Sequence, residues 1–250
     1  MNLDNLNREI EIAIKAAKSS GDLLIDSKSQ LNKEISSNPK DTKLKADVAS
    51  ENSIKEIILN SSDYPILAEE SGKSKDDLGK IFWVIDPLDG TGNYNRGIPI
   101  CCVSIGLVSK MEPIAGVIYD FNNNDLYVGN SINKTATLNN KAINVSEVSK
   151  KEDGILITGL PHNTDYSDDA LKKMVEDMQS WKKVRMIGSA AMASCYVACA
   201  KGELYKENGV YLWDIIAGAA IVNSAGGKAE ISNMQKNYQV DVNFSNSHIK

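Results

Sequence analysis

Residues 83–94 read Trp83-Val-Ile-Asp-Pro-Leu-Asp-Gly-Thr-Gly-Asn-Tyr94 and belong to an apolar run that begins at Ile81. A short, nearly all-apolar run that ends at acidic residues is typical of a buried strand whose charges lie where it leaves the core. Pro87 fixes φ, and the turn that follows brings Asp89 back towards Asp86. The sequence therefore predicts a strand that carries two carboxylates to one edge of a sheet.

The chemistry of this stretch favours a hard metal ion. Two carboxylates with the Leu88 carbonyl between them offer oxygen ligands that suit Mg²⁺ better than a softer metal. Gly90 permits a left-handed conformation or a close backbone approach. If residues 90–92 open a short helix, their N–H groups form an anion site beside the metal, and the two together would hold a phosphate. Taken alone, however, the same residues are also good type I turn chemistry.

Three further acidic features stand at the ends of predicted elements. Glu69 and Glu70 end a short apolar run, Asp214 follows a tryptophan at a helix start, and Asp47 opens a helix. Each has an ordinary structural interpretation, as a solvated strand end or as a helix N-cap. Only their combination with the 83–94 stretch favours a catalytic site.

Hydrophobic periodicity divides the chain into an N-terminal α+β half, residues 1–140, and a C-terminal α/β half, residues 141–250, packed as one compact unit. The resulting fold class is a layered sandwich with alternating α-β-α-β-α layers. Residues 29–46 are polar and are predicted to be a loop. The first half is expected to hold helices over 3–28 and 47–60 and an antiparallel sheet with strands at 66–68, 81–85, 100–108, 114–119 and 125–128. The second half is expected to hold strands at 154–160, 184–187 and 203–206, helices at 168–180, 189–201 and 213–224, and two or three final strands.

Composition narrows the class of protein. The 250 residues are 42% hydrophobic and 24% charged, with a net charge of −5, so the chain has no basic footprint for nucleic acid. No apolar run reaches the roughly 18–20 residues of a membrane helix, and the polar N-terminus is unlike a signal peptide, so we expect a cytoplasmic protein. The four cysteines match no zinc spacing and are expected to be buried thiols. With only two histidines, carboxylates must carry any catalysis.

Four segments together resemble the inositol monophosphatase superfamily of Mg²⁺-dependent, lithium-sensitive phosphomonoesterases. Besides residues 83–94, they are Trp213-Asp-Ile-Ile-Ala-Gly-Ala-Ala-Ile-Val-Asn-Ser-Ala-Gly-Gly227, Ala68-Glu-Glu-Ser71 and Ala46-Asp47. They stand in the order of the family, and the likeness covers essentially the whole chain. The resemblance implies direct hydrolysis of a small phosphorylated metabolite, with no covalent intermediate, by a homodimer.

The resemblance also implies a set of metal ligands. Glu69, Asp86 and the Leu88 carbonyl correspond to ligands of one Mg²⁺, and Asp86, Asp89 and Asp214 correspond to ligands of a second. A third, weaker ion near Glu69 is a further possibility in the family, so we expect two or three ions.

Further site residues follow from the same resemblance. Asp47 and Thr91 correspond to a hydrogen-bonded pair that acts with Glu69 near the nucleophilic water, and the Gly90 and Thr91 amides would take the phosphate. Glu207 corresponds to an acid that accepts ring hydroxyls of the substrate. The turn that lines the substrate corresponds to Gly188, Ser189 and Ala190.

The substrate is expected to be inositol monophosphate, because a carboxylate facing the pocket suits a neutral polyol and disfavours a second phosphate. Lys43 and Lys45 stand where the family commonly has small residues. They are either solvated or reach a substrate phosphate, which would instead favour fructose 1,6-bisphosphate or 3′-phosphoadenosine 5′-phosphate. The alternatives are thus a fructose-1,6-bisphosphatase, a 3′(2′),5′-bisphosphate nucleotidase or, in another class, a non-catalytic regulatory binder.

Overall fold

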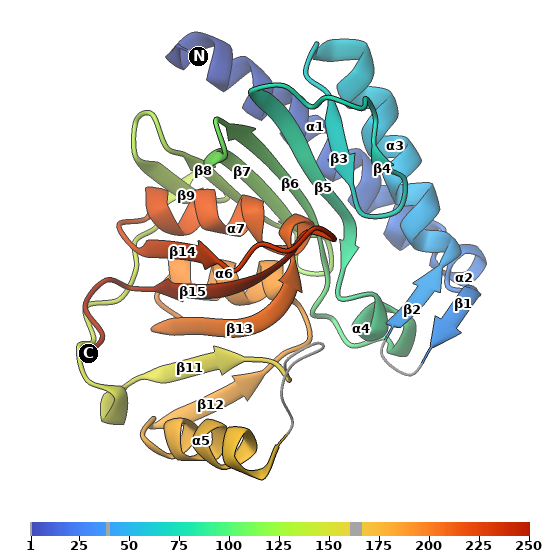
Figure 1. Cartoon of the computed structure of the whole chain (residues 1–250). Coiled ribbons are helices and arrows are strands. Elements are labelled where there is room, and N and C mark those ends of the chain that lie inside the picture. Colours follow the sequence, from blue (N-terminus) through green and yellow to red (C-terminus); the bar gives the residue numbers. More distant parts are fainter. Residues whose placement is uncertain (1, 39–40, 161–166) are drawn as a thin grey trace.

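The structure, a computed structural model, describes residues 2–38, 41–160 and 167–250. Its helices and strands form five layers (Figure 1). Two long N-terminal helices pack together against one face of the larger sheet, two C-terminal helices lie between the sheets, and one helix lies on the outer face of the smaller sheet. The expected α-β-α-β-α sandwich is confirmed. In chain order the α-helices are α1 (Leu3–Asp26), α2 (Lys28–Leu31), α3 (Lys45–Ser61), α4 (Thr91–Arg96), α5 (Asp168–Gln179), α6 (Ala190–Ala198) and α7 (Leu212–Ser224).

The larger sheet has the order β10-β9-β8-β7-β6-β5-β3-β4 over the described residues. The sheet is antiparallel as predicted except at one pair, where the chain turns back at β4 and then enters β5 parallel to β3. Three short strands (β4, β9 and β10) also went unpredicted. The bounds are β3 (Ile66–Ala68), β4 (Gly72–Lys73), β5 (Ile81–Asp89), β6 (Cys102–Ser109), β7 (Glu112–Asp120), β8 (Asp125–Asn130), β9 (Thr135–Leu138) and β10 (Lys141–Ala142).

The segment predicted as a loop over 29–46 instead contains regular secondary structure. It contains α2 and an antiparallel pair of strands, β1 (Glu34–Asn38) and β2 (Asp41–Leu44), with residues 39–40 outside the described part. The prediction was wrong because this ribbon is short and polar and, of its described residues, contributes only Leu44 to the core, so it shows no alternation of apolar and polar residues. The next helix, α3, begins two residues before Asp47, which places Asp47 in its first turn.

The smaller sheet has the order β12-β11-β13-β15-β14. Strand β11 runs parallel to both of its neighbours, so the carboxyl ends of β11, β12 and β13 meet at one edge. The strand predicted over 203–206 continues to residue 211, because the turn-like pair Asn208-Gly209 is a bulge inside the strand and not its end. The bounds are β11 (Ile155–Thr158), β12 (Lys183–Met186), β13 (Leu204–Tyr211), β14 (Lys228–Ser232) and β15 (Gln239–Ser245).

Helix α7 is pressed unusually close to the larger sheet. A Cβ on Gly116 of β7 would lie 2.1 Å from the Ala217 carbonyl oxygen, and one on Gly129 of β8 would lie 2.6 Å from Ile221 Cα. Only glycine allows this approach, since a side chain at either position would collide with helix backbone. The close contact fixes the position of α7 and therefore of Asp214 in its first turn.

The core between the two sheets contains residues of both sequence halves, including Phe82 and Tyr127 of the first and Ile215 and Phe244 of the second. This shared core supports the proposal that residues 1–140 and 141–250 form one compact unit. Within the described residues, no helix is both long and apolar enough to span a membrane.

Candidate active site

The parallel pair β3 and β5 brings two acidic residues to the same edge of the larger sheet. Ala68 is paired with Ile85, and the Glu69 amide donates to the Ile85 carbonyl at 3.1 Å, so Glu69 and Asp86 each follow the pairing directly. The Glu69 and Asp86 carboxyl groups are close enough for each to shift the pKa of the other. Two residues 17 positions apart in the chain thereby become neighbours.

A bulge shapes the end of β5. Asp86 pairs with Ser104 and Asp89 with Cys102, so three steps along β5 match two along β6. Asp86 Oδ1 accepts a hydrogen bond of 2.9 Å from the Leu88 amide, which forms an Asx turn around Pro87. The bulge therefore turns Asp86 and Asp89 out of the regular strand alternation while both stay buried.

Beyond the bulge, Thr91 connects the β5 end to α3. Its hydroxyl lies 2.8 Å from Asp47 Oδ1 and 3.0 Å from the Leu88 carbonyl oxygen, while Asp47 Oδ2 accepts 2.6 Å from the Leu44 amide. Gly90 has φ +85°, and a Cβ there would lie 2.8 Å from the Ile100 carbonyl oxygen. Glycine is thus required at this position both by conformation and by space.

Two helix starts hold the remaining acids. Asp214 Oδ2 accepts 3.0 Å from the Tyr211 amide in the first turn of α7. Asp89 lies at the start of α6, where the Ser189 hydroxyl and the Ala191 amide, at 2.8 Å, both donate to Oδ2. A carboxylate is favoured at the positive end of a helix. The turn predicted to line the substrate therefore also contacts Asp89, which sequence reasoning missed.

Asn93 is a second residue that sequence reasoning missed. Its side-chain amide donates to the Ile100 carbonyl at 2.7 Å and to the Ile187 carbonyl at 2.8 Å. These bonds join α4 to the turn at Gly188, which has φ +70°. The only available signal was its place inside the 83–94 stretch.

The acids of this cluster repel one another's charge. Burial and then the charges of neighbouring carboxylates hold the pKa of Glu69, Asp86 and Asp214 well above the usual range. Burial also raises the pKa of Asp89, although its hydrogen bonds with Ser189 and α6 oppose the shift. Burial raises the pKa of Asp47 to about 6, against the hydrogen bonds from Leu44 and Thr91. A cation among these groups would relieve the repulsion.

The donor set fits a hard divalent cation, because it consists of carboxylate and carbonyl oxygens that already carry an excess of negative charge. In their present side-chain arrangement, no three His, Cys, Asp or Glu side chains of the described residues are placed to hold one ion. Asp89 faces α6 and Asp214 faces the Tyr211 amide. These residues therefore fit a divalent cation in the type and charge of their ligand atoms, while Asp89 and Asp214 accept hydrogen bonds from protein groups.

Glu207 lies on β13, and its charge acts on Asp214. Its Oε2 accepts 3.0 Å from the Tyr205 hydroxyl, and a Cβ on Gly159 would lie 2.2 Å from Oε1. Burial raises the pKa of Glu207 to about 7, with the Tyr205 hydrogen bond opposing the shift and the charge of Asp89 adding to it. Glu207 is thus a half-buried carboxyl held in one position at the carboxyl end of β11.

The two lysines upstream of Asp47 differ in their surroundings. Lys43 forms an ion pair with Glu70, which raises the pKa of Lys43. Lys45 is exposed at the start of α3.

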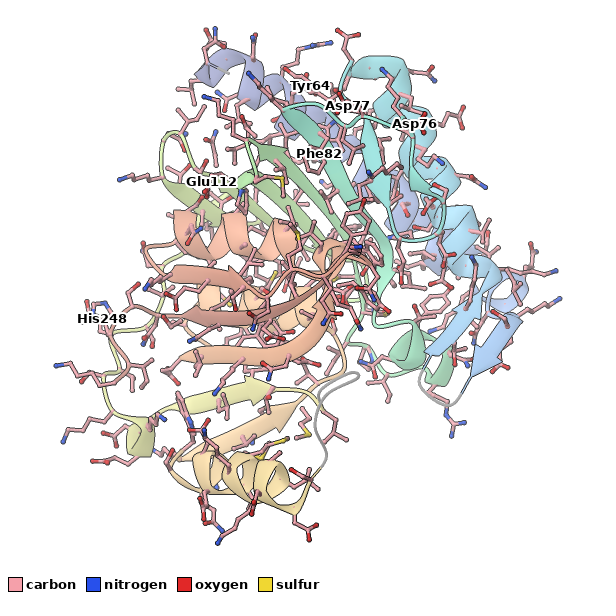
Figure 2. The ribbon with its side chains drawn as sticks, in the orientation of Figure 1. Tyr64, Asp76, Asp77, Phe82, Glu112 and His248 are labelled. Carbon is pink, nitrogen blue, oxygen red and sulfur yellow. The ribbon has the colours of Figure 1, made fainter. Side chains whose placement is uncertain are left out.

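Of the remaining candidate groups, Cys102 lies beside the acidic cluster, where its thiol donates to Asp89 Oδ2 at 3.8 Å. Figure 2 shows His248 beside the C-terminus, far from the end of β5, and His162 lies outside the described residues. The four cysteines are free thiols, three of them buried and Cys199 half-buried, as expected from the sequence.

The raised carboxyl pKa values predict how the metal-free protein responds to pH. The folded state binds protons more tightly than the unfolded chain, so the free energy of unfolding falls as pH rises through these pKa values. For Asp47 alone, a rise from 3.8 to about 6 corresponds to about 3 kcal/mol. We expect the Tm in EDTA to be higher at pH 5 than at pH 8, and Mg²⁺ to raise the Tm more at pH 8. A Tm that increases from pH 5 to pH 8 in EDTA would contradict the repulsion.

A layered α/β sandwich with carboxylates clustered at its strand ends and helix starts provides the oxygen ligands that a metal-dependent hydrolase needs. The sequence model described as the inositol monophosphatase family matches residues 5–244, and the chain belongs to this family. It is therefore an enzyme that hydrolyses phosphate monoesters of small molecules, in a family that is generally metal-dependent.

Individual relatives are similar to most of the chain. The chain is 37% identical to "Nus factor SuhB" of Xylella fastidiosa over 87% of this chain and 80% of that protein. It is 37% identical to "Inositol-1-monophosphatase" of Synechocystis sp. over 73% of this chain and 64% of that protein. The solved inositol monophosphatase of Anabaena (Nostoc) sp. superposes with a TM-score of 0.82 at 34% identity, covering 97% of this chain and 92% of that chain.

Proposed function

We propose that this chain hydrolyses inositol monophosphate with the aid of Mg²⁺. The observation that carries the proposal is the cluster of Glu69, Asp86, Asp89 and Asp214, four carboxyl groups whose pKa values burial raises, with the charges of neighbouring carboxylates raising those of Glu69, Asp86 and Asp214 further. In this proposal Glu69, Asp86 and the Leu88 carbonyl hold one Mg²⁺. Asp86, Asp89 and Asp214 hold a second, with a third, weaker ion near Glu69 as an option.

Bound Mg²⁺ lowers the pKa of a water molecule and stabilises charge on the phosphoryl group. Side chains of the protein are proposed to orient this water molecule. When the Thr91 hydroxyl donates to Asp47, its oxygen lone pairs are free to accept a hydrogen bond from a water beside Glu69. Asp47, whose pKa is about 6, is ionised at neutral pH and keeps the hydroxyl hydrogen in this direction. The backbone amides of Gly90 and Thr91 are proposed to bind the phosphate oxygens.

Glu207 is proposed to select the alcohol part of the substrate. Its Oε2 is held by Tyr205, which leaves Oε1 as an acceptor for a hydroxyl group. A carboxylate there accepts from a polyol and repels a second phosphate. The turn of Gly188, Ser189 and Ala190 is proposed to line the same pocket.

Replacement of Glu207 by Gln tests this role. We expect kcat/KM for inositol 1-phosphate to fall about tenfold, because the charge-assisted hydrogen bond to the substrate is weakened, and kcat/KM for 4-nitrophenyl phosphate to change less than about twofold. Glu112→Gln, an exposed residue at the start of β7, is the matched control and should change neither. An equal fall in kcat/KM for both substrates would show that Glu207 has only a structural role.

The substrate itself is tested by Mg²⁺-supported phosphate release from inositol 1-phosphate, fructose 1,6-bisphosphate and 3′-phosphoadenosine 5′-phosphate. We expect preference for inositol 1-phosphate, because Lys43 is engaged by Glu70 and Lys45 is directed to solvent. Preference for a bisphosphate would overturn the substrate assignment and leave the metal site in place.

Relatives named "Nus factor SuhB" make a regulatory binding role the second candidate. Catalysis is favoured for this chain, because a binding role does not require Glu69, Asp86, Asp89 and Asp214 to crowd at one strand edge against their own repulsion. Lithium inhibition, a homodimer and a cytoplasmic location are further proposals that rest on the family resemblance. Phosphate release in the presence of LiCl and sedimentation of the purified protein test the first two.

A further inference from the structure

Lys43 is a cation at the edge of the acidic cluster. It stands on β2 and pairs with Glu70, the residue directly after Glu69. The Lys43 side chain is 35% exposed and the Glu70 side chain only 12%, so the pair is partly shielded from water. The charges of Asp47 and Glu51 also act on Lys43 and raise its pKa further.

Glu70 is fixed in place independently of Lys43. Its backbone amide donates to Glu51 Oε2 at 2.9 Å, and Glu51 lies on α3. Lys55, one turn further along α3, lies 3.6 Å from Glu51 Oε1 and donates to the Ser71 hydroxyl at 2.8 Å. The turn after β3 is thus hydrogen-bonded to α3 at Glu70 and at Ser71. Neither contact involves Lys43, so we expect Glu70 to keep its position when Lys43 is replaced.

The charge of Glu70 reaches the proposed metal site. It is one of the groups that raise the pKa of Glu69, and it also raises the pKa of Asp47. Neutralising Glu70 therefore changes the electrostatic potential at Glu69 and Asp47, because its charge already acts on both carboxyl groups.

We propose that the Lys43–Glu70 ion pair sets the affinity of this site for divalent cations, with Lys43 cancelling a carboxylate charge that would otherwise add to those of Glu69 and Asp47. Lys43 is a positioning residue that touches neither metal nor substrate. The inference rests on the proposed function for its relevance to turnover, although cation binding itself can be measured without it.

A double-mutant cycle tests the pair. Lys43→Met leaves the Glu70 charge uncompensated, and we expect Mg²⁺ to bind about three- to tenfold more tightly. Glu70→Gln leaves the Lys43 charge uncompensated, and binding should weaken by about the same factor. In the double variant both charges are gone, so the affinity should return to within about twofold of wild type.

The readout is calorimetric titration of the EDTA-treated full-length protein with MgCl₂, together with the rise in Tm at each Mg²⁺ concentration. The Mg²⁺ concentration for half-maximal phosphate release is measured in parallel. Lys43→Arg retains the charge and should bind Mg²⁺ as wild type does, and Lys45→Met is the matched control for loss of an exposed lysine in the same segment.

Opposite shifts in the two single variants, cancelled in the double variant, support the proposal. Weakened binding in Lys43→Met that persists in the double variant would show that Lys43 only holds the β1–β2 ribbon, and equal binding in all four proteins would show no coupling. Either result overturns the proposal. If no substrate is hydrolysed by any variant, the proposed function fails, while the calorimetric cycle still decides the role of Lys43.

Discussion

Asp214→Asn is expected to reduce kcat/KM by about 10³-fold or more, because it removes the charge of a proposed metal ligand. The substitution is expected to leave the fold unchanged. Asp214 caps α7 by accepting from the Tyr211 amide at 3.0 Å, and an asparagine carbonyl oxygen can accept the same bond. Because burial and the charge of Asp89 hold the pKa of Asp214 well above its usual range, the neutral side chain should also raise the Tm of the metal-free protein.

Loss of activity with an unchanged or higher Tm distinguishes a functional carboxylate from a structural one. Asp77→Asn is the matched control, because Asp77 Oδ1 likewise accepts a backbone hydrogen bond, 2.8 Å from the Gly79 amide. Figure 2 labels Asp77 near Phe82, at the opposite end of β5 from Asp86. The control should keep its activity to within about twofold. If turnover is unchanged in Asp214→Asn, Asp214 is not a metal ligand.

Removal of divalent cations with EDTA is expected to lower phosphate release by about 10³-fold, and added Mg²⁺ should restore it. The residues at the site offer carboxylate and carbonyl oxygens and, among the described residues, no histidine near them, so these side chains supply no substitute for the metal. Ca²⁺ should restore activity poorly, since it accepts more ligands and looser geometry than Mg²⁺.

Zinc provides the control for metal identity. The proposed ligands are all oxygen atoms and include none of the nitrogen and sulfur donors that Zn²⁺ prefers, so Mg²⁺ should be the better activator at equal concentration. Full activity of the EDTA-treated protein in metal-free buffer would contradict the mechanism. Circular dichroism before and after EDTA should show that the secondary structure is kept.

Short-range features of the site could be predicted from the sequence because their causes are local. The turn at Asp86 and Pro87 and the glycine at position 90 follow from φ restrictions and from hydrogen bonds over two or three residues. The start of α7 beside Asp214 follows from helix-capping chemistry in the same way. The ligand set as a whole came from the family resemblance, since spacing alone left a plain turn open.

Long-range contacts required the tertiary structure. The parallel pairing of β3 with β5 places Glu69 beside Asp86, and nothing in either segment specifies the direction of the pairing. The contact of Asp89 with the start of α6 joins residues about 100 positions apart. The β1–β2 ribbon was missed for a related reason, because its two short polar strands show no alternation of apolar and polar residues and are defined only by their pairing.

The sequence by itself determined the class of fold, the acidic strand ends and the family, because hydrophobic periodicity and motif chemistry are local properties of the chain. Only the tertiary structure decided which of these acids meet, that Asp89 faces α6 and that Lys43 pairs with Glu70. Those contacts depend on how close the layers approach, as at Gly116 against α7, and on which strand enters the sheet in which direction. Packing of distant segments, which no local pattern encodes, assembles the candidate site.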